Sequence, residues 1–199
     1  MELNADDDND TLEQKEYKCS SKRRRRMQYS VNGELSHYRK SMTKFLTTTR
    51  FNNETWQENV QYRARNPHLA CIYPTSQTNS AQIGPDKVMF VLEMNNEINR
   101  IMGIGIVRNH AFIQKHRVYS NDNYNRYAYL GKYRIDRTAM TEDEERIMKL
   151  FDILCFTGSR HMKRLQGIKV FPIDMLYRCH KILDLVDYIT QMFKKRIAQ

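Results

Sequence analysis

"KVMFVLEMNNEINRIMGIGIV", residues 87–107, is the stretch that decides the fold of this chain. Its KVMFVLEM segment is almost continuously apolar, which is typical of a strand covered on both faces. The NNEIN segment predicts a turn and the apolar RIMGIGIV segment predicts a return strand, so the two strands form a hairpin. Gly103 and Gly105 share one face of the return strand. The missing side chains there let another backbone or a flat ligand come close, or permit a barrel corner.

Helical periodicity flanks this hairpin on both sides. The segments with that periodicity are Ser41–Arg65, Met140–Phe156 and Ile173–Lys195. In the first of them, Asn53 is a start signal and Pro67 follows the end. In the second, Thr141 and Glu144 form a capping box, which predicts where the helix begins. The apolar stripe expected on the buried side of that second helix comprises Ile147, Leu150, Phe151 and Leu154.

The tyrosine-rich stretch HRVYSNDNYNRYAYLGKYRIDR (116–137) lies between the hairpin and the second helix. Alternation along 127–135 predicts one strand that carries three tyrosines on the same face: Tyr127, Tyr129 and Tyr133. Tyrosine favours strands in any case, so this face is either part of the core or a platform on which bases stack. On a platform, the neighbouring arginines would contact phosphates, and Asn121, Asn123 and Asn125 could read base edges.

Charge is distributed unevenly along the chain. The net charge is +10, but residues 1–16 carry −6, which leaves +16 for the remainder. A strongly basic body indicates a polyanionic partner, and nucleic acid is the leading candidate. Residues 1–40 combine an acidic block, the run KRRRR and few large apolar side chains, a composition that predicts a disordered tail. The basic run fits a nuclear-import address, a phosphate-binding arm or a nonspecific solvated tail.

A second basic segment, GSRHMKRLQG (158–167), places its bases between two glycines. Glycine lets the backbone approach a phosphate, and the bases would neutralise it: Arg160, His161, Lys163 and Arg164. The segment matches no Walker pattern, and an ordinary basic surface loop explains it equally well.

Patterns for catalysis, metal binding and membrane insertion are weak. The sequence contains no GxSxG, HExxH or zinc-deaminase motif. Glu93, at the end of the apolar strand, is expected to be a carboxylate in water rather than a buried acid. The cysteines form no CxxC pair and are expected to be buried structural residues: Cys19, Cys71, Cys155 and Cys179. No apolar run approaches the length of a membrane span, and the acidic N-terminus is neither a secretion signal nor a transit peptide, so we expect no membrane contact.

Three parts of the chain carry a resemblance to a known family: CIYPTSQ with VMFVLEMNNEINRIMGIGIVRN, VYSNDNYNRYAYLGKYRIDR, and LCFTGSRHMKRLQGIKVFP. Over roughly 67–176 the chain resembles an uncharacterised family carried by nucleocytoplasmic large DNA viruses of eukaryotes. That resemblance implies no activity. It implies an infected host cell as the setting, with the viral factory, the nucleus or the virion as the location.

A second resemblance is to PUA-like small barrels, the group that includes the ASCH, EVE and YTH domains. It rests on the order of VMFVLEM, GIGIV and HMKRLQG. It implies a protein that binds RNA, or a modified base in an aromatic pocket. The sequence departs from that group in its aromatic residues, because its one tryptophan, Trp56, falls on the first expected helix and no tryptophan cage can be placed.

These observations together predict a tail over residues 1–40 and a single α+β domain over 41–199. The domain would hold a small mixed or antiparallel sheet, or a partly closed PUA-like barrel, packed by three helices. We expect a nucleic-acid-binding protein without cofactor or metal, which recognises RNA, single strands or modified bases. The residues expected to bind are Tyr124, Arg126, Tyr127, Tyr129, Tyr133, Arg134, Arg160, His161, Lys163 and Arg164.

The main alternative is a virion structural protein that contacts packaged genome or an acidic partner, with a viral protein or a second copy of itself as a further partner. An enzyme that acts on nucleic acid is a weaker alternative, and the sequence favours a binding protein without deciding the point.

Overall fold

The computed structural model describes residues 32–78, 83–113, 116–164 and 166–198. The chain divides into two compact units, Met1–Ser41 and Met42–Gln199. In the first unit, residues 32–41 are helical, and the rest of the predicted tail lies outside the described residues. The fold described below is that of the second unit.

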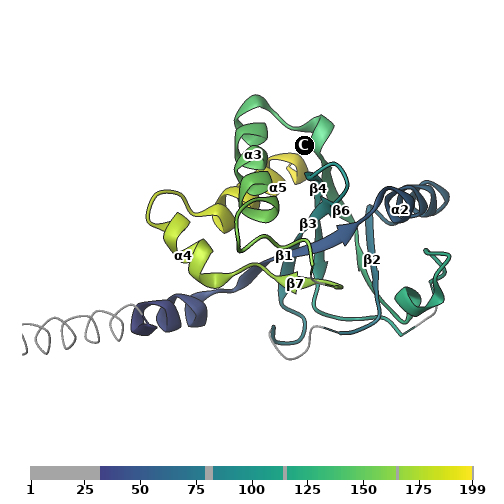
Figure 1. Ribbon diagram of the computed structural model, residues 1–199, viewed down its shortest axis with the longest axis horizontal. Helices are drawn as coiled ribbons and strands as arrows, with labels where there is room; N and C mark the ends of the chain where they lie inside the picture. The colour runs from purple at the N-terminus through teal and green to yellow at the C-terminus, as the bar shows by residue number, and fades with distance from the viewer. Residues whose placement is uncertain (1–31, 79–82, 114–115, 165, 199) are drawn as a thin grey trace, which may run out of the picture. The chain divides into compact units, whose positions relative to one another are not determined.

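A mixed five-stranded sheet forms the centre of the second unit (Figure 1). Its strands, in spatial order, are β6 (Tyr133–Asp136), β4 (Arg100–Arg108), β3 (Val88–Asn95), β1 (Lys44–Phe51) and β7 (Lys169–Val170). Strands β1 and β3 run parallel, and the other neighbours are antiparallel. The predicted hairpin is confirmed, since β3 and β4 pair from Val88 opposite Arg108 to Asn95 opposite Arg100.

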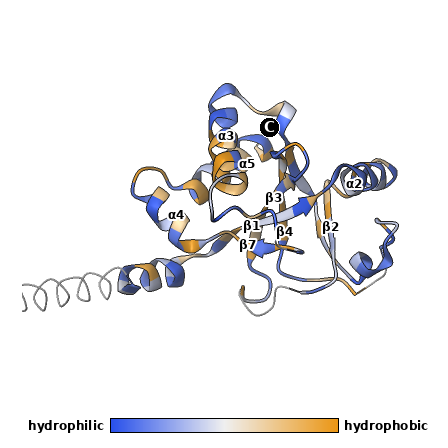
Figure 2. Cartoon of the chain, viewed as in Figure 1, coloured by the Kyte–Doolittle hydropathy of each residue, from blue (hydrophilic) through white to orange (hydrophobic). Residues whose placement is uncertain are grey.

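Strand β3 is covered on both faces, as its apolar sequence predicts. Met89 and Val91 belong to a core cluster on one face. Phe90 points to the other face, where its ring stacks on Phe193 with the centroids 5.7 Å apart. Phe193 lies on α5 (Leu185–Ile197), which covers this face together with α3 (Glu142–Phe156), as Figure 1 shows. In Figure 2, hydrophobic residues are concentrated on the central strands and on the helix sides that face them.

The opposite face of the sheet is covered by helix α2 (Asn53–Arg65) and by a two-stranded ribbon of β2 (Cys71–Thr75) and β5 (Tyr127–Gly131). The prediction of a single tyrosine strand is wrong, because β5 pairs with β2 whereas β6 pairs with β4. The chain crosses over β4 between them, so close that a side chain on Gly131 would overlap the Ile106 carbonyl. The described strands therefore form two sheets and no closed barrel.

The first and last predicted helices have different bounds in the structure. Residues 44–51 form strand β1, so the helix expected over Ser41–Arg65 is only correct from Asn53 onward. The final segment forms two helices, α4 (Ile173–His180) and α5, rather than one. Asp184 separates them, because its side chain accepts the N–H groups of Val186 and Asp187 and thereby caps α5.

Helix α3 begins as predicted, with the Thr141–Glu144 capping box in place. Its buried stripe is displaced from the predicted one and consists of Glu144, Met148, Phe151, Cys155 and Phe156. Of the cysteines within the described residues, Cys71 and Cys155 are buried and Cys179 is half-buried.

Replacing Gly105 by alanine is expected to lower the free energy of unfolding by about 1–3 kcal/mol or more, the usual cost of overpacking a core. The new Cβ would overlap the Tyr73 hydroxyl and lie 2.8 Å from Cys71 Sγ, where β2 packs on β4. Urea unfolding followed by circular dichroism measures the change. The matched control is Gly84→Ala, because the nearest atom to its Cβ would be 3.7 Å away on the flexible Lys87 side chain. Equal stability of the two variants would show that β2 and β4 do not pack in this way.

Candidate functional site

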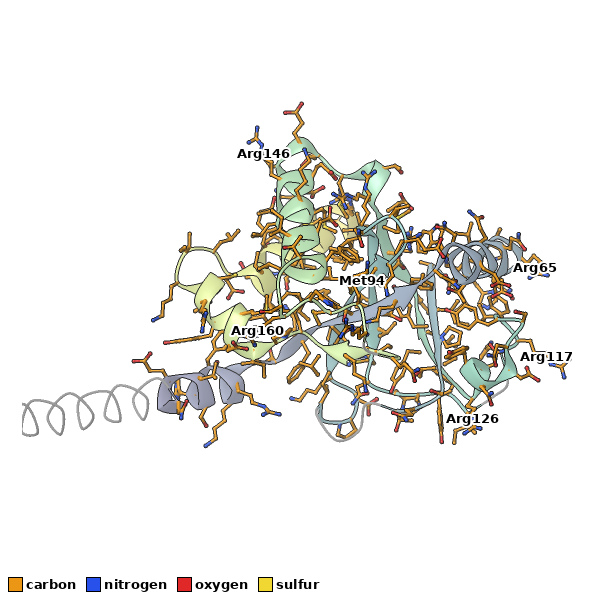
Figure 3. All side chains as sticks on the ribbon, viewed as in Figure 1. Arg65, Met94, Arg117, Arg126, Arg146 and Arg160 are labelled. Atoms are coloured by element: carbon orange, nitrogen blue, oxygen red, sulfur yellow. The ribbon has the colours of Figure 1, made fainter. Side chains whose placement is uncertain are left out.

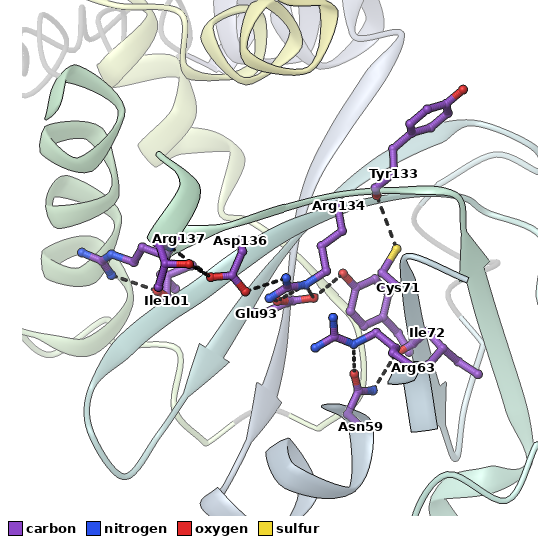
Figure 4. A network of polar contacts seen from close by, with 12 residues as sticks. Asn59, Arg63, Cys71, Ile72, Glu93, Ile101, Tyr133, Arg134, Asp136 and Arg137 are labelled. Atoms are coloured by element: carbon purple, nitrogen blue, oxygen red, sulfur yellow. Dashed lines mark hydrogen bonds and ion pairs between the residues drawn. The ribbon is translucent and has the colours of Figure 1, made fainter. Parts of the chain in front are cut away.

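A buried ion pair lies between the central sheet and the β2–β5 ribbon (Figure 4). Glu93 is completely buried, so the expectation that it sits in water is wrong. Arg134 donates to the Glu93 carboxylate from Nε at 3.0 Å and from Nη2 at 2.7 Å. The Tyr73 hydroxyl donates to Glu93 Oε1 at 2.8 Å. The carboxylate is therefore satisfied by a cation and a phenol from two other strands.

Other groups hold the Arg134 guanidinium on its remaining sides. It donates to Asp136 at 2.7 Å and lies 5.6 Å from the centroid of the Trp56 ring. Burial lowers the pKa of Arg134, but the adjacent Glu93 carboxylate outweighs that effect and raises the pKa above its ordinary value. The side chain is only 7% exposed. Arg134 therefore stabilises the fold in this conformation and is not available to bind a phosphate.

Gly103 leaves the space that this ion pair occupies. A Cβ at Gly103 would lie 2.7 Å from Arg134 Nη2 and 2.8 Å from Glu93 Oε2. The glycine face of β4 is thus filled by side chains of the protein itself. Glu93 and Arg134 lie against Gly103, and Tyr73 and Cys71 lie against Gly105. No flat ligand is needed to explain these two glycines.

A pocket of about 270 Å³ opens where several segments end. It lies at the end of β1, the start of α2, the end of β2, the loop before β5 and the basic loop 157–168. Its walls include Arg50, Phe51, Thr75, Tyr119, Tyr124 and Gly167. It thus combines a cation, hydroxyl groups and aromatic rings in one concave site, which is the usual composition of a small-ligand pocket.

Arg50 borders this pocket, but its guanidinium lies with Thr48 on the α3 side of the sheet, and its hydrogen-bond partners are all uncharged. Its Nε donates to the Met162 carbonyl at 2.7 Å and Nη1 to the Gly167 carbonyl at 3.0 Å. Nη2 donates to the Thr48 hydroxyl at 2.8 Å. Burial lowers the pKa of Arg50 to about 10. Because a guanidinium has five N–H groups, two remain after these three bonds.

Arg50 differs in this respect from the other buried arginines. Arg134 pairs with Glu93, and Arg137 lies 2.8 Å from both Glu145 and Asp152. Within the described ranges, no carboxylate lies within ion-pair distance of Arg50. A partly buried cation without a counter-charge is costly, so the Met162, Gly167 and Thr48 oxygens are what stabilises the Arg50 charge within the described residues.

Side chains of the sheet hold the backbone of the basic loop on either side of residue 165, at the described residues 157–164 and 166–168. Arg50 binds two of its carbonyls, and Asn96 Nδ2 donates to the Lys163 carbonyl at 3.0 Å. Gly167 has φ of +65°, a conformation that favours glycine. Asn96 Oδ1 is buried in the pocket wall and has no partner among the residues that the structure describes.

Two tyrosines form the aromatic wall. Tyr124 is 39% exposed, and its ring meets that of Tyr119 edge to face with the centroids 6.4 Å apart. Asn125 fixes their loop, because its side chain accepts the N–H groups of Val118 and Tyr119 and donates to the Tyr119 carbonyl. The Asn125 side chain is thus occupied by hydrogen bonds within the protein and is not available to read a base edge.

The structure distributes the predicted binding residues over three places. Tyr124 lines the pocket. Residues Arg160, His161, Lys163 and Arg164 lie on the basic loop, which reaches the pocket at Gln166 and Gly167. The remaining predicted residues lie elsewhere: Tyr129 is buried in the core, Tyr127 is half-buried on β5, Tyr133 is exposed on β6 and Arg126 is exposed.

The basic residues of the loop differ in their ion pairing and in their exposure to solvent. Arg160 is paired with Asp174, whereas Arg164 is exposed and Lys163 is half-buried. His161 is half-buried, and its Nδ1 has no partner within the described part of the chain. Figure 3 shows Arg126 and Arg117 projecting at the periphery, and Arg146 at the outer end of α3, far from both.

Several pocket residues carry no signal in the sequence. The helical pattern over Ser41–Arg65 includes Arg50 and Phe51, whereas the structure places both at the end of strand β1. Asn96 lies in the predicted hairpin turn, and Tyr119 is one of many tyrosines in its stretch. The β-branched run before the Asn52 cap, which includes Thr47 and Thr49, is the pattern that predicts strand β1 and with it this site.

Comparisons with known proteins add no assignment: no family model matches the chain, and no curated protein is similar to it in sequence. Within the described ranges, no helix is both long and apolar enough to cross a membrane. The same residues contain no group of three or more histidine, cysteine or acidic side chains placed to hold a metal ion.

Replacing Glu93 by glutamine is expected to lower the free energy of unfolding by about 3 kcal/mol, because Arg134 loses its buried counter-charge and keeps only the partly exposed Asp136 carboxylate. Chemical denaturation measures the loss. The double variant Glu93→Leu with Arg134→Met is expected to recover much of it, since buried pairs are often replaced by apolar residues without loss. Glu97→Gln, on the exposed turn, is the control and should change stability by less than about 0.5 kcal/mol. A Glu93→Gln variant as stable as this control would contradict the ion pair.

Proposed function

We propose that this protein binds single-stranded nucleic acid and holds one nucleotide in the pocket beside Arg50. The observation that carries the proposal is a concave pocket with an exposed tyrosine ring, Tyr124, next to a basic loop in a strongly basic chain. A nucleotide supplies both complements, an anionic phosphate and a flat base. In a duplex the bases are stacked and their Watson–Crick edges are paired, so a duplex presents no single base to such a pocket.

Each wall of the pocket suits one part of a nucleotide. The exposed Tyr124 ring offers a surface on which a base can stack. Lys163 and Arg164, on the loop that reaches the pocket, suit phosphate oxygens. A ribose has one hydroxyl more than a deoxyribose, so we expect RNA to bind somewhat more tightly than DNA.

The charge of the chain supports the same proposal beyond the pocket. Residues 17–199 carry a net charge of +16, which attracts any polyanion without regard to sequence. Lys163 and the exposed Arg164 continue the positive charge along the loop from the pocket. A strand that places one base against Tyr124 can therefore extend its phosphates along this loop.

The test compares binding of short single-stranded RNA, single-stranded DNA and duplex DNA of matched sequence to the full chain, by fluorescence anisotropy at low and moderate salt. We expect single strands to bind more tightly than duplex and to retain part of their affinity at the higher salt, because stacking is not screened. Tyr124→Ala should weaken single-strand binding by about 1–3 kcal/mol, the value of one lost stack.

The matched control is Tyr133→Ala, since Tyr133 is 48% exposed and lies on β6 rather than at the pocket. It should leave affinity unchanged. Equal effects of the two tyrosine variants, or binding to all three nucleic acids that disappears with salt, would show a general polyanion surface instead of a pocket. Arg164→Ala should weaken binding, while Arg146→Ala on α3 should not.

A further inference from the structure

The pocket lies on one face of the sheet, and the pleat of β1 decides which side chains reach it. Thr49 pairs with Glu93, whose side chain faces the β2–β5 ribbon. Thr49 and Phe51 therefore point to the ribbon side, where they line the pocket. The Arg50 guanidinium lies with Thr48 on the α3 side. The β1 side chains that face the pocket are thus uncharged.

The other walls of the pocket are uncharged as well. Thr75 ends the ribbon strand β2, and Asn52 and Thr55 stand at the start of α2. Gly167 brings the basic loop against the ribbon, because a Cβ there would lie 2.6 Å from Thr75 Oγ1. None of the described residues that line the pocket is acidic. An anionic group would lose its water in this pocket without gaining a cation, so the base of a nucleotide enters and the phosphate stays outside.

One polar group on the β1 side of the pocket has no partner within the described part of the chain. Thr49 is 6% exposed, and its hydroxyl forms no hydrogen bond with any residue that the structure describes. Thr47, two residues earlier on the same face of β1, instead donates to the Phe90 carbonyl at 3.0 Å. Buried hydroxyl groups are normally hydrogen-bonded, and each can donate once and accept twice. The Thr49 hydroxyl is therefore placed to bond the edge of a group that enters the pocket.

We propose, on the basis of the proposed function, that this pocket recognises the base of the nucleotide it holds, so that the protein prefers one base at one position of a single strand. Tyr124 stacks on that base, and the Thr49 hydroxyl and the Gln166 amide bond its edge. Lys163 and Arg164 contact phosphates outside the pocket and contribute affinity without base preference.

The experiment uses the full chain and five single-stranded RNAs of equal length and equal phosphate number. Four carry one base, A, C, G or U, at the centre of an otherwise abasic strand, and the fifth is abasic throughout. The preferred base should raise affinity about tenfold over the abasic strand, as expected for one stacked base. It should exceed the least favoured base at least about fivefold, the lower end of discrimination by contacts to a base edge. The salt dependence should be the same for all five strands, because the base adds no charge.

Variants then assign the preference to residues. Thr49→Val keeps the branched shape and removes the hydroxyl, so it should reduce the difference between the best and the worst base at least about threefold. It should leave binding of the abasic strand unchanged. The matched control is Thr43→Val, at an exposed residue just before β1, which should change neither. Arg164→Ala should weaken all five strands alike and keep the base preference. Thermal unfolding verifies folding, and Gln166→Ala, at an exposed residue, takes the place of Thr49→Val if that variant does not fold.

The outcomes separate this inference from the proposed function. Equal affinity for the four bases, each above that for the abasic strand, would overturn base recognition and leave binding of a stacked single strand in place. A base preference that neither Thr49→Val nor Gln166→Ala alters would also overturn it, because the base would then be read elsewhere. An abasic strand that binds as tightly as the other four, or absence of binding to every strand, would remove the proposed function and the inference together.

Discussion

The Glu93 carboxylate is buried at the centre of the structure, and much of the surrounding arrangement is needed to accommodate it. A carboxylate without exposure to water requires a cation and further donors, since its desolvation is otherwise prohibitive. Arg134 and Tyr73 supply them from β6 and β2, so three strands on two sheets meet at this group. Gly103 and Gly105 leave the space on β4 that the side chains fill. The chain must therefore cross over β4 between β5 and β6, which divides the tyrosine stretch between the two sheets.

Arg134 and Arg50 differ in their partners. Arg134 is neutralised by Glu93 and Asp136 and covered by Trp56, so it joins the ribbon, the sheet and α2. Arg50, at the end of β1, binds only carbonyl and hydroxyl oxygens. These bonds hold the basic loop against the sheet, and within the described residues no carboxylate pairs with the guanidinium.

The pocket owes its position to a change in chain direction. Strand β1 ends at Phe51, Asn52 caps α2 with the help of Thr55, and the basic loop returns along β1 as strand β7. Side chains fix two of the loops that meet there. Asn96 and Arg50 donate to carbonyls of the basic loop, and the Asn125 side chain accepts the N–H group of Val118 in the tyrosine loop. A site supported in this way is preorganised, which lowers the entropy lost when a ligand binds.

The sequence by itself determined the features that depend on local pattern. The β3–β4 hairpin, the burial of β3 on both faces, the capping box of α3 and the end of α2 before Pro67 all follow from apolar runs, turns and caps. The α+β class with a mixed sheet follows from their order, and the basic loop was recognised from its glycines and charges. Tertiary structure alone decided which tyrosines are exposed, that Glu93 is buried, and that β1 is a strand. It also placed Arg50, Asn96 and Tyr124 in one pocket. Side chains far apart in sequence meet only through sheet register and crossing, and the burial of a charged group depends on partners that no local pattern identifies.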